Sequence, residues 1–300
     1  MRKPRRRRDW PWAAVLLAPV LVAFAMWVFY PLGRTIWLGT QRSDPFGLRT
    51  EYVGFDQYRE VLDSSQFHNS LKVTLAYVLI SVPIALVLGL GLAVLANTQL
   101  RGMRFFRTVF SSTVASSVAV SALLWFVLLQ PSVGIVNQFL QSIGREPVDF
   151  LNDPDRALFA VSATSVWQNL GIVFVTVIAG LQAMPQELHE AARVDGHGAW
   201  SRFRNVTVPM ISPTLMFTTV VLTIRAFQTF GEIDLLTQGG PNERTNVLTY
   251  ALYTTVYKER DPGGGAALAV VLFVIILLLT MVQFRFLERR VHYAGTTSAG

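Results

Sequence analysis

The sequence lacks cysteine, has few charged residues and contains no phosphate-binding loop, and each absence excludes a class of protein. Without cysteine there is no disulfide framework, thiolate metal site or cysteine nucleophile. The cysteine content therefore does not indicate an oxidising or a reducing compartment. Only 15% of the 300 residues are charged, whereas soluble proteins carry about 25%. No Gly-x-x-x-x-Gly-Lys-Ser/Thr pattern occurs, so the chain is not itself a P-loop ATPase. The glycine run 263–265 lacks that lysine and is predicted to be a flexible start to a helix.

Histidine is also scarce, and its spacing does not favour a metal site. The four histidines are scattered, and no two of them lie four residues apart as in a zinc-binding helix. No paired carboxylates or Ser-His arrangement supports an intramembrane enzyme. We therefore expect no catalytic residues and no metal.

Long apolar runs dominate what is present. Hydrophobic residues make up 52% of the chain, and they gather into runs of the ~20 residues needed to cross the hydrocarbon core of a bilayer. These runs predict an all-α integral membrane protein with six transmembrane helices in one domain, residues 10–287. The six expected spans are 10–32, 69–96, 105–129, 157–183, 211–233 and 266–287.

The net charge of +7 is explained better by membrane topology than by a surface that binds nucleic acid. Six spans place both termini on one side of the membrane. The tail 1–9, the links 97–107 and 184–208 and the segment from Arg285 together carry 15 of the 26 Lys and Arg residues. The other three loops carry nine over a greater length, with more acidic residues than basic ones. By the positive-inside rule, both termini, including the tail 288–300, are expected in the cytoplasm.

The N-terminal segment allows two alternatives. The apolar run that follows the tail could be a signal peptide with Ala23-Phe24-Ala25 as the cleavage site. However, the run continues past that point to Tyr30, which favours a membrane anchor. A basic arm that binds nucleic acid is also disfavoured, because six basic residues beside a hydrophobic helix fit a cytoplasmic anchor, so no nucleic-acid partner is expected.

The polar stretch 184–209 separates the fourth and fifth predicted spans. Pro185 suits the first turn of a helix, where its missing N–H has no cost, and Gly196 suits a helix end. We therefore predict two short helices, 185–195 and about 199–207, joined by a glycine elbow. A simple turn needs only a few residues, so this loop is interpreted as a docking surface.

The loop contains Glu190-Ala191-Ala192, then Asp195-Gly196, then Pro209. This pattern resembles the EAA loop of permeases from binding-protein-dependent ABC importers, although His197 stands where that family prefers alanine. The resemblance implies that these six residues couple the permease to an ATPase. Two small alanines would keep one helix face flat, Glu190 would offer a charge to the partner, and Gly196 would allow the elbow.

Other segments narrow the resemblance. Leu236-Thr237-Gln238-Gly239-Gly240-Pro241 resembles the outer loop of carbohydrate-type (MalF/MalG-like) permeases. Two further segments, Asp44-Pro45-Phe46-Gly47 and Val282-Gln283-Phe284-Arg285, are similar to the first permease subunit of glycerol-3-phosphate (UgpA-type) importers.

The resemblance implies a type I ABC importer fold in the bacterial cell membrane. The implied partners are a second homologous permease, two ATPase subunits and an extracytoplasmic solute-binding protein. ATP and Mg²⁺ would bind to the ATPase subunits, and this chain would need no cofactor. The implied cargo is glycerol-3-phosphate or a glycerophosphodiester, with a neutral oligosaccharide as the alternative.

Polar residues within the spans are candidates for the substrate pathway, because they are costly in lipid and usually face a bundle interior or a cavity. Arg225 could bind an anionic group of the cargo, or it could snorkel or pair with Glu232 or Asp234. The remaining candidates are Gln228, the neighbours Gln168 and Asn169, and Trp125. Gln168 and Asn169 could instead bond helix to helix, and Trp125 could belong to an interfacial aromatic belt.

A stand-alone secondary transporter remains as an alternative of a different class. Such transporters typically show internal repeats and coupling residues near the middle of the bilayer. We find no repeat and no acidic residue near the middle of the predicted spans. These observations favour a non-catalytic importer subunit.

Overall fold

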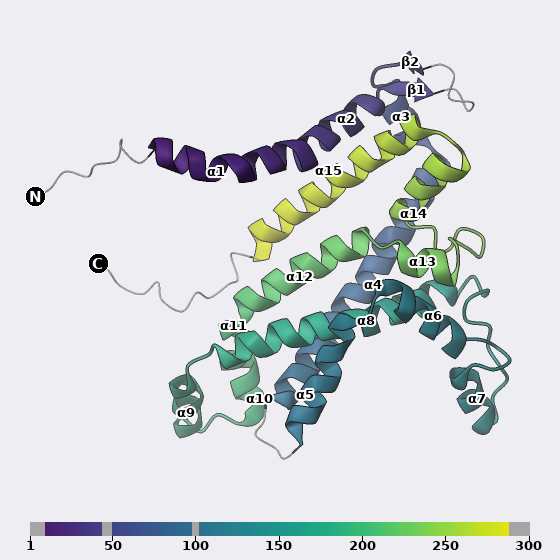
Figure 1. Ribbon diagram of the computed structural model, residues 1–300. Helices are drawn as coiled ribbons and strands as arrows, with labels where there is room; N and C mark the ends of the chain where they lie inside the picture. The colour runs from purple at the N-terminus through teal and green to yellow at the C-terminus, as the bar shows by residue number, and fades with distance from the viewer. Residues whose placement is uncertain (1–9, 44–49, 98–101, 288–300) are drawn as a thin grey trace, which may run out of the picture. The chain divides into compact units, whose positions relative to one another are not determined.

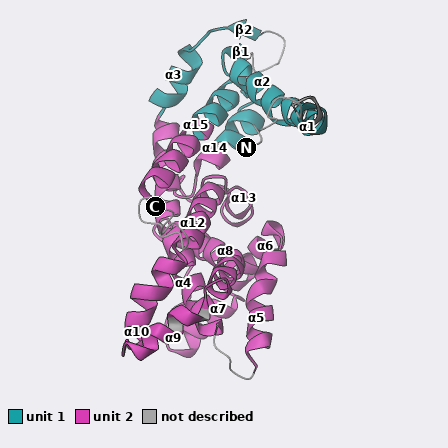
Figure 2. Ribbon diagram, turned by 90° about the vertical axis from the view of Figure 1, so that its left-hand side faces the viewer, with its two compact units in different colours: residues 1–64, 252–272 teal, residues 65–251, 273–300 magenta. Residues whose placement is uncertain are grey.

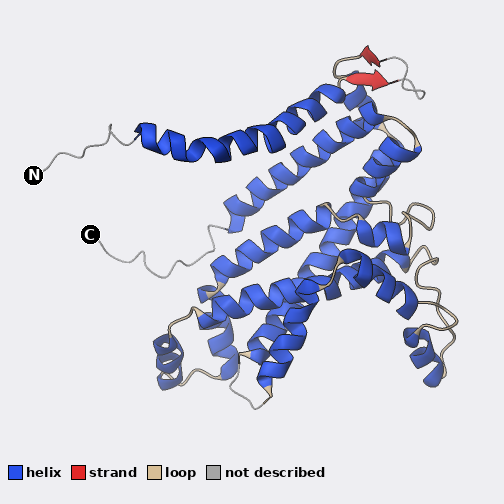
Figure 3. Ribbon diagram, viewed as in Figure 1, coloured by secondary structure: helices blue, strands red, loops and turns tan. Residues whose placement is uncertain are grey.

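A computed structural model describes residues 10–43, 50–97 and 102–287. The described chain is mainly helical, with one short two-stranded sheet (Figures 1 and 3). The basic tail 1–9, the segment 44–49 and the tail 288–300 lie outside the described residues. The chain divides into two compact units, which we describe separately (Figure 2). The first contains residues 1–64 and 252–272, and the second contains residues 65–251 and 273–300.

In the first unit, a continuous apolar helix leads to a small hairpin. The helical segments are α1 (Trp10–Phe24), the π-helical η1 (Ala25–Phe29) and α2 (Tyr30–Leu38). The strands β1 (Gln41–Ser43) and β2 (Thr50–Tyr52) pair antiparallel with Gln41 opposite Tyr52. The unit also contains α3 (Asp56–Asp63), η4 (Thr254–Lys258) and the first part of α15 (Pro262–Leu287).

The glycine run at the start of α15 corrects one prediction. Gly263, Gly264 and Gly265 are helical and buried, so they are not a flexible lead-in. Asp261 caps this helix, because its Oδ1 accepts a hydrogen bond of 2.9 Å from the Gly264 N–H. A side chain at Gly263 would collide with the Gln41 carbonyl. The glycines are therefore needed for close packing.

The second unit is built around α4 (Ser65–Ala96) and α8 (Ala157–Gln182), which pack along each other. Alanines of α4 are buried, as are several valines and Phe174 of α8. Gly89 is one point of closest approach, since a Cβ there would overlap the Val173 side chain. Small residues that bring helices together in this way are typical of membrane bundles.

The remaining elements of the second unit are shorter. Near the middle of the chain they are α5 (Met103–Ser112), η2 (Thr113–Ala115), α6 (Val118–Leu128) and α7 (Ile135–Ser142). Then follow α9 (Gln186–Val194), α10 (Ala199–Arg202), η3 (Phe203–Thr207), α11 (Val208–Met210), α12 (Ser212–Phe227) and α13 (Gly231–Leu236). The helix α14 (Leu248–Tyr253) begins in this unit.

The described part of the chain has four helices that are long and apolar enough to cross a membrane, namely Ala13–Leu38, Ser65–Ala96, Ala157–Gln182 and Pro262–Leu287. Two bent pairs raise this number to six if each pair is one span, namely Met103–Ala115 with Val118–Leu128 and Ala199–Met210 with Ser212–Phe227. The chain is thus a multi-pass helical membrane protein, and the count of six spans stays a prediction.

The third predicted span, 105–129, is not one continuous helix. Its two halves meet at an angle of 106°. Ser116 and Ser117 are extended at the break, with ψ values of 128° and 151°. Ser117 then caps α6, because its Oγ accepts a hydrogen bond of 3.2 Å from the Val120 N–H. Serine side chains that bond to nearby backbone compete with helix formation, and here they also start a new helix.

The fifth predicted span, 211–233, is also shorter than expected. It begins after a bend of 69° at Ile211 and ends at Phe227. The Phe227 carbonyl accepts a hydrogen bond of 2.8 Å from the Thr249 hydroxyl, which satisfies one of the unpaired groups at the helix end. Residues 228–230 then form a break before α13, and this break lies beside the site described next.

Candidate functional site

The loop 184–209 has the predicted form of two helices with a glycine elbow. The first helix is α9, and the second runs through α10, η3 and α11 from Ala199 to Met210, beyond its predicted end near 207. At the elbow, Gly196 has a φ of +76°. The Gly196 N–H donates to the Arg193 carbonyl and the His197 N–H donates to the Ala192 carbonyl, each at 3.1 Å. These two bonds form a Schellman motif, which ends a helix at a residue of left-handed conformation.

The histidine that departs from the EAA pattern is accommodated by the second helix. The His197 Nδ1 lies 2.9 Å from the Ser201 Oγ. The His197 carbonyl accepts a hydrogen bond of 3.1 Å from the Arg202 guanidinium. The elbow is therefore held from both sides, by the end of α9 and by the start of α10.

Exposure within the loop differs from residue to residue. Glu190, Ala191 and Asp195 are exposed, whereas Ala192 is buried and only 5% exposed. The predicted flat face of two alanines therefore has only Ala191 available on the outside. Ala192 instead lets α9 pack against its own chain.

Large apolar side chains are exposed on the same loop. Val194 is 87% exposed and Trp200 is 72% exposed. Both flank the elbow, where the expected partner would dock. Exposed apolar groups beside charged ones are typical of a surface that binds another protein.

The loop connects directly to a helix of the second unit. Pro209 lies in α11, at the bend of 69° that leads into α12. From Ser212 to Arg225 the helix α12 rises roughly 20 Å, at about 1.5 Å per residue. The loop and Arg225 are therefore connected by this bend and by the single helix α12.

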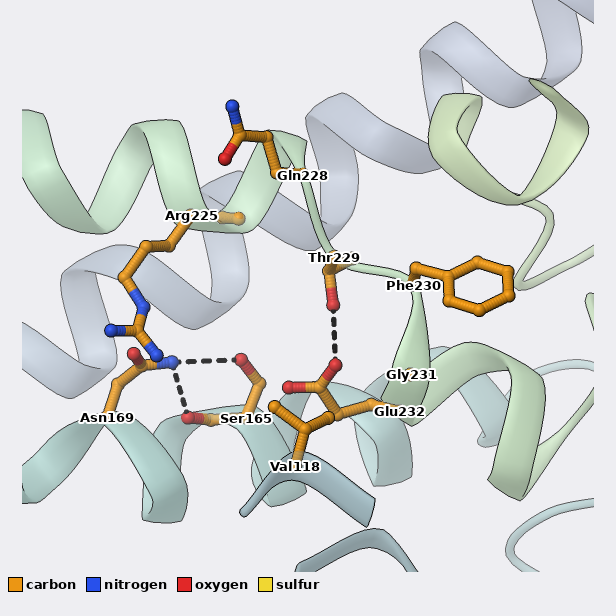
Figure 4. Close-up of a pocket in the computed structure, with 10 residues that line it drawn as sticks. Val118, Ser165, Asn169, Arg225, Gln228, Thr229, Phe230, Gly231 and Glu232 are labelled. Carbon is orange, nitrogen blue, oxygen red and sulfur yellow. Dashed lines mark hydrogen bonds between the residues drawn. The ribbon is translucent and has the colours of Figure 1, made fainter. Parts of the chain in front are cut away.

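At the far end of α12 lies a cavity of about 310 Å³. Four helices and the break after α12 form its walls (Figure 4). The lining residues are Val118, Ser165, Asn169, Arg225, Ala226, Gln228, Thr229, Phe230, Gly231 and Glu232. We call this cavity the α12 pocket. Its volume is at the lower end of the range of about 300–1,000 Å³ seen for small-molecule sites.

Three of the five candidate pathway residues line the α12 pocket. They are Asn169, Arg225 and Gln228. The Asn169 amide donates to the Ser165 carbonyl at 2.8 Å and to the Ser165 Oγ at 3.2 Å. This orients the amide and leaves its buried Oδ1 without a partner in the described structure. Asn169 thus lines the pocket with an amide whose nitrogen is bonded and whose oxygen is buried.

Arg225 is exposed, and it makes no ion pair within 4.0 Å of any described acidic residue. The predicted alternative of pairing with Glu232 or Asp234 is therefore wrong for the structure as described. Figure 4 shows the Arg225 side chain extending toward Asn169. Its guanidinium remains available as a fork of donors for an anionic group.

The other two candidates do not line the pocket. Gln168 is buried and 7% exposed, but it lies outside the lining set. Trp125 packs edge-on against Trp167, with ring centroids 6.3 Å apart. A role for these two residues in the pathway stays a prediction.

Glu232, Thr229 and Ser165 also line the pocket, although none of them is among the predicted pathway residues. The Tyr77 hydroxyl donates to the Thr229 Oγ1 at 3.3 Å, and Thr229 in turn donates to the Glu232 Oε2 at 2.9 Å. These residues come from α4, from the break after α12 and from α13. The position of Glu232 at the end of a predicted span was a signal in the sequence. The residues that bond to it or line the pocket beside it could be identified only from the fold.

The comparisons with known proteins agree with this architecture. A bacterial ABC transporter that imports the acidic polysaccharide alginate superposes with a TM-score of 0.78, at 24% identity over 94% of this chain and 96% of the other. A bacterial alginate ABC transporter in complex with a periplasmic protein bound to an alginate pentasaccharide gives a TM-score of 0.80, at 23% identity over 94% of this chain and 96% of the other. The fold is therefore that of an ABC importer permease.

The chain belongs to the family of binding-protein-dependent transport system inner membrane components, whose model matches residues 63–293. It is similar to the sn-glycerol-3-phosphate transport system permease protein UgpA of Pectobacterium atrosepticum, at 34% identity over 97% of this chain and 98% of the relative. It is also similar to UgpA of Agrobacterium fabrum, at 36% identity over 93% of this chain and 95% of that protein. The chain is accordingly a transport component, and nothing in these relatives indicates catalytic activity.

Proposed function

We propose that this chain is a transmembrane permease subunit of an ATP-driven importer for glycerol-3-phosphate or glycerophosphodiesters in the bacterial inner membrane. The observation that carries the proposal is its 34–36% identity to permeases of that name over nearly the whole chain. The unpaired guanidinium of Arg225 in the α12 pocket supports it, because Arg binds phosphate groups through paired donors.

The importer contains a second, homologous permease, two ATPase subunits and an extracytoplasmic solute-binding protein. ATP and Mg²⁺ bind to the ATPase subunits, and this chain holds no cofactor. The binding protein delivers cargo at the outer side, and Arg225, Asn169 and Gln228 contact it in the α12 pocket. The alginate transporter that shares this fold, which has been solved with its periplasmic protein, is a precedent for such a partner.

The loop 184–209 couples ATP hydrolysis by the ATPase subunits to transport of the cargo. Closure of the ATPase pair moves α9 and the α10–η3 helix, with contacts made by Glu190, Ala191, Asp195 and the elbow at Gly196. The movement passes through the bend at Pro209 into α12 and changes which side of the membrane the α12 pocket faces. The mechanism is alternating access by rigid-body motion.

The cargo is tested by reconstituting the complete importer with its binding protein in liposomes and measuring ATP hydrolysis. Glycerol-3-phosphate or a glycerophosphodiester is expected to stimulate hydrolysis, while maltose-like sugars have no effect. Stimulation by the sugars alone would replace the proposed cargo with a neutral oligosaccharide. Transport by this chain alone without ATP would instead establish a secondary transporter.

The membrane orientation can be tested separately, because the chain has no native cysteine. Val194 in the elbow and Gln141 in α7 are both exposed, and the proposed topology places them on opposite sides. In intact cells, an impermeant thiol reagent should label Gln141→Cys and not Val194→Cys. Labelling of both variants or of Val194→Cys alone would contradict the proposed orientation.

A further inference from the structure

Glu232 is a buried carboxylate with unused hydrogen-bonding capacity. The residue is only 6% exposed and lines the α12 pocket. An ionised carboxylate has about four acceptor positions, and the structure gives Glu232 one donor, the Thr229 hydroxyl at 2.9 Å. It makes no ion pair within 4.0 Å of any described basic residue. A buried charge without a full set of partners is costly, so the remaining acceptor positions need donors.

The carboxylate is also held in a defined orientation. Thr229 is 7% exposed and Tyr77 is fully buried, and together they form a chain of hydrogen bonds that ends on the Glu232 Oε2. Figure 4 shows this bond on one side of the carboxylate, with Val118 and Gly231 beside it. The other oxygen of Glu232 has no hydrogen bond from a described residue. A rotamer held on one side and unsatisfied on the other is suited to binding a ligand.

The pocket therefore presents two unlike charges that do not neutralise each other. Arg225 offers donors only, whereas the Glu232 carboxylate offers acceptors only. A phosphate group is attracted to the guanidinium and repelled by the carboxylate. Hydroxyl groups, in contrast, can donate to the carboxylate through charge-assisted bonds.

We infer that Glu232 is a specificity-determining residue that accepts hydrogen bonds from the hydroxyl groups of the cargo while Arg225 binds its anionic group. This inference rests on the proposed function and narrows it to a class of cargo, the anionic polyols. The two ends of such a molecule are distinguished by charge, so it binds in one orientation. An anion of similar size without hydroxyls leaves Glu232 unsatisfied and is disfavoured, because a site built for hydroxyls rejects analogues that lack them.

The test uses equilibrium binding to the complex of both permeases and the ATPases, without the binding protein, so that only the permease site selects. Two ligands are compared, namely glycerol-3-phosphate and propyl phosphate, which lacks both hydroxyls. The variant Glu232→Gln keeps the size of the side chain and removes the charge. Because charge-assisted hydrogen bonds are roughly twice as strong as neutral ones, it should bind glycerol-3-phosphate about tenfold more weakly. Its affinity for propyl phosphate should not fall.

The matched control is Asp234→Asn, which removes a carboxylate two residues away on the same helix and outside the pocket lining. It should bind both ligands as the wild type does. Equal losses for both ligands in Glu232→Gln would assign Glu232 a structural role and overturn the inference, as would unchanged binding of glycerol-3-phosphate. Failure of the wild-type complex to bind glycerol-3-phosphate at all would instead overturn the proposed cargo, and the two failures are thereby distinguished.

Discussion

The loop 184–209 and the α12 pocket lie at opposite ends of α12, and they are built in different ways. The loop consists of consecutive residues whose shape is set by neighbours in the sequence, such as the two hydrogen bonds around Gly196. The pocket collects side chains from α6, α8, α12 and α13, and no short segment contains them. The shape of the loop is therefore encoded locally, whereas the lining of the pocket depends on the packing of the whole unit.

The largest expected effect tests the local character of the loop. Gly196→Thr should reduce both transport and co-purification of the ATPase at least tenfold. A Cβ at Gly196 meets no atom within 4 Å, so the change acts only through the φ of +76°. A left-handed conformation costs an ordinary residue about 1–2 kcal/mol, and a β-branched one is strained further.

Gly198→Thr is the matched control for this prediction. Gly198 is also free of neighbours within 4 Å, but its φ is −65° and it precedes α10 as the N-cap. Threonine and glycine are about equally good at that position. Gly198→Thr should keep ATPase binding and transport. Equal behaviour of the two variants would show that the elbow conformation does not determine docking.

The second prediction addresses the pocket end of the comparison. Arg225→Lys keeps the charge but loses the planar fork of donors, so transport of an anionic cargo should fall about 10- to 100-fold, the loss expected for a charged hydrogen bond. ATPase co-purification should stay normal. Arg244→Gln is the control, because Arg244 is exposed and lies outside the pocket lining. Normal transport by Arg225→Lys would remove Arg225 from the cargo site.

The contrast between local and tertiary determination also explains which features could be predicted from the sequence. Pro185 and Gly196 act on residues beside them, so the two short helices and the elbow were predicted within a few positions. The long apolar helices α4 and α8 were predicted because length and hydropathy are enough to identify them. The family was recognisable from Glu190-Ala191-Ala192 and its spacing to Gly196 and Pro209.

Tertiary packing determined the features that the sequence did not reveal. The bend of 106° in the third predicted span arises where Ser117 turns to cap α6. The apolar composition of this run does not indicate that the helix breaks there. Gly171 of α8 lies against this break, because a Cβ there would collide with Thr113. The chain of hydrogen bonds that ends on Glu232 likewise joins distant parts of the sequence, because Tyr77 and Thr229 are 152 residues apart.

The third prediction separates cargo recognition from stability within the pocket. Thr229→Val removes the donor that orients Glu232, so the preference for glycerol-3-phosphate over propyl phosphate should fall by about threefold to fivefold, since the net contribution of a typical hydrogen bond is about 1 kcal/mol. Thr249→Val removes a similar bond of 2.8 Å to the Phe227 carbonyl, outside the pocket. It should lower thermal stability and leave the preference unchanged. A changed preference in Thr249→Val would show that the ratio reports general loosening of the unit.

The fourth prediction, of similar size to the third, distinguishes two adjacent residues that the sequence could not separate. Gln168 and Asn169 follow each other on α8, but only Asn169 lines the pocket, where its buried Oδ1 is unsatisfied. Asn169→Ala should weaken binding of glycerol-3-phosphate about threefold to fivefold, as expected for one neutral hydrogen bond. Gln168→Ala should lower stability through lost packing and leave cargo affinity within twofold of the wild type. If Gln168→Ala weakens binding more than Asn169→Ala, the cargo lies on the other face of α8, and the α12 pocket is not its site.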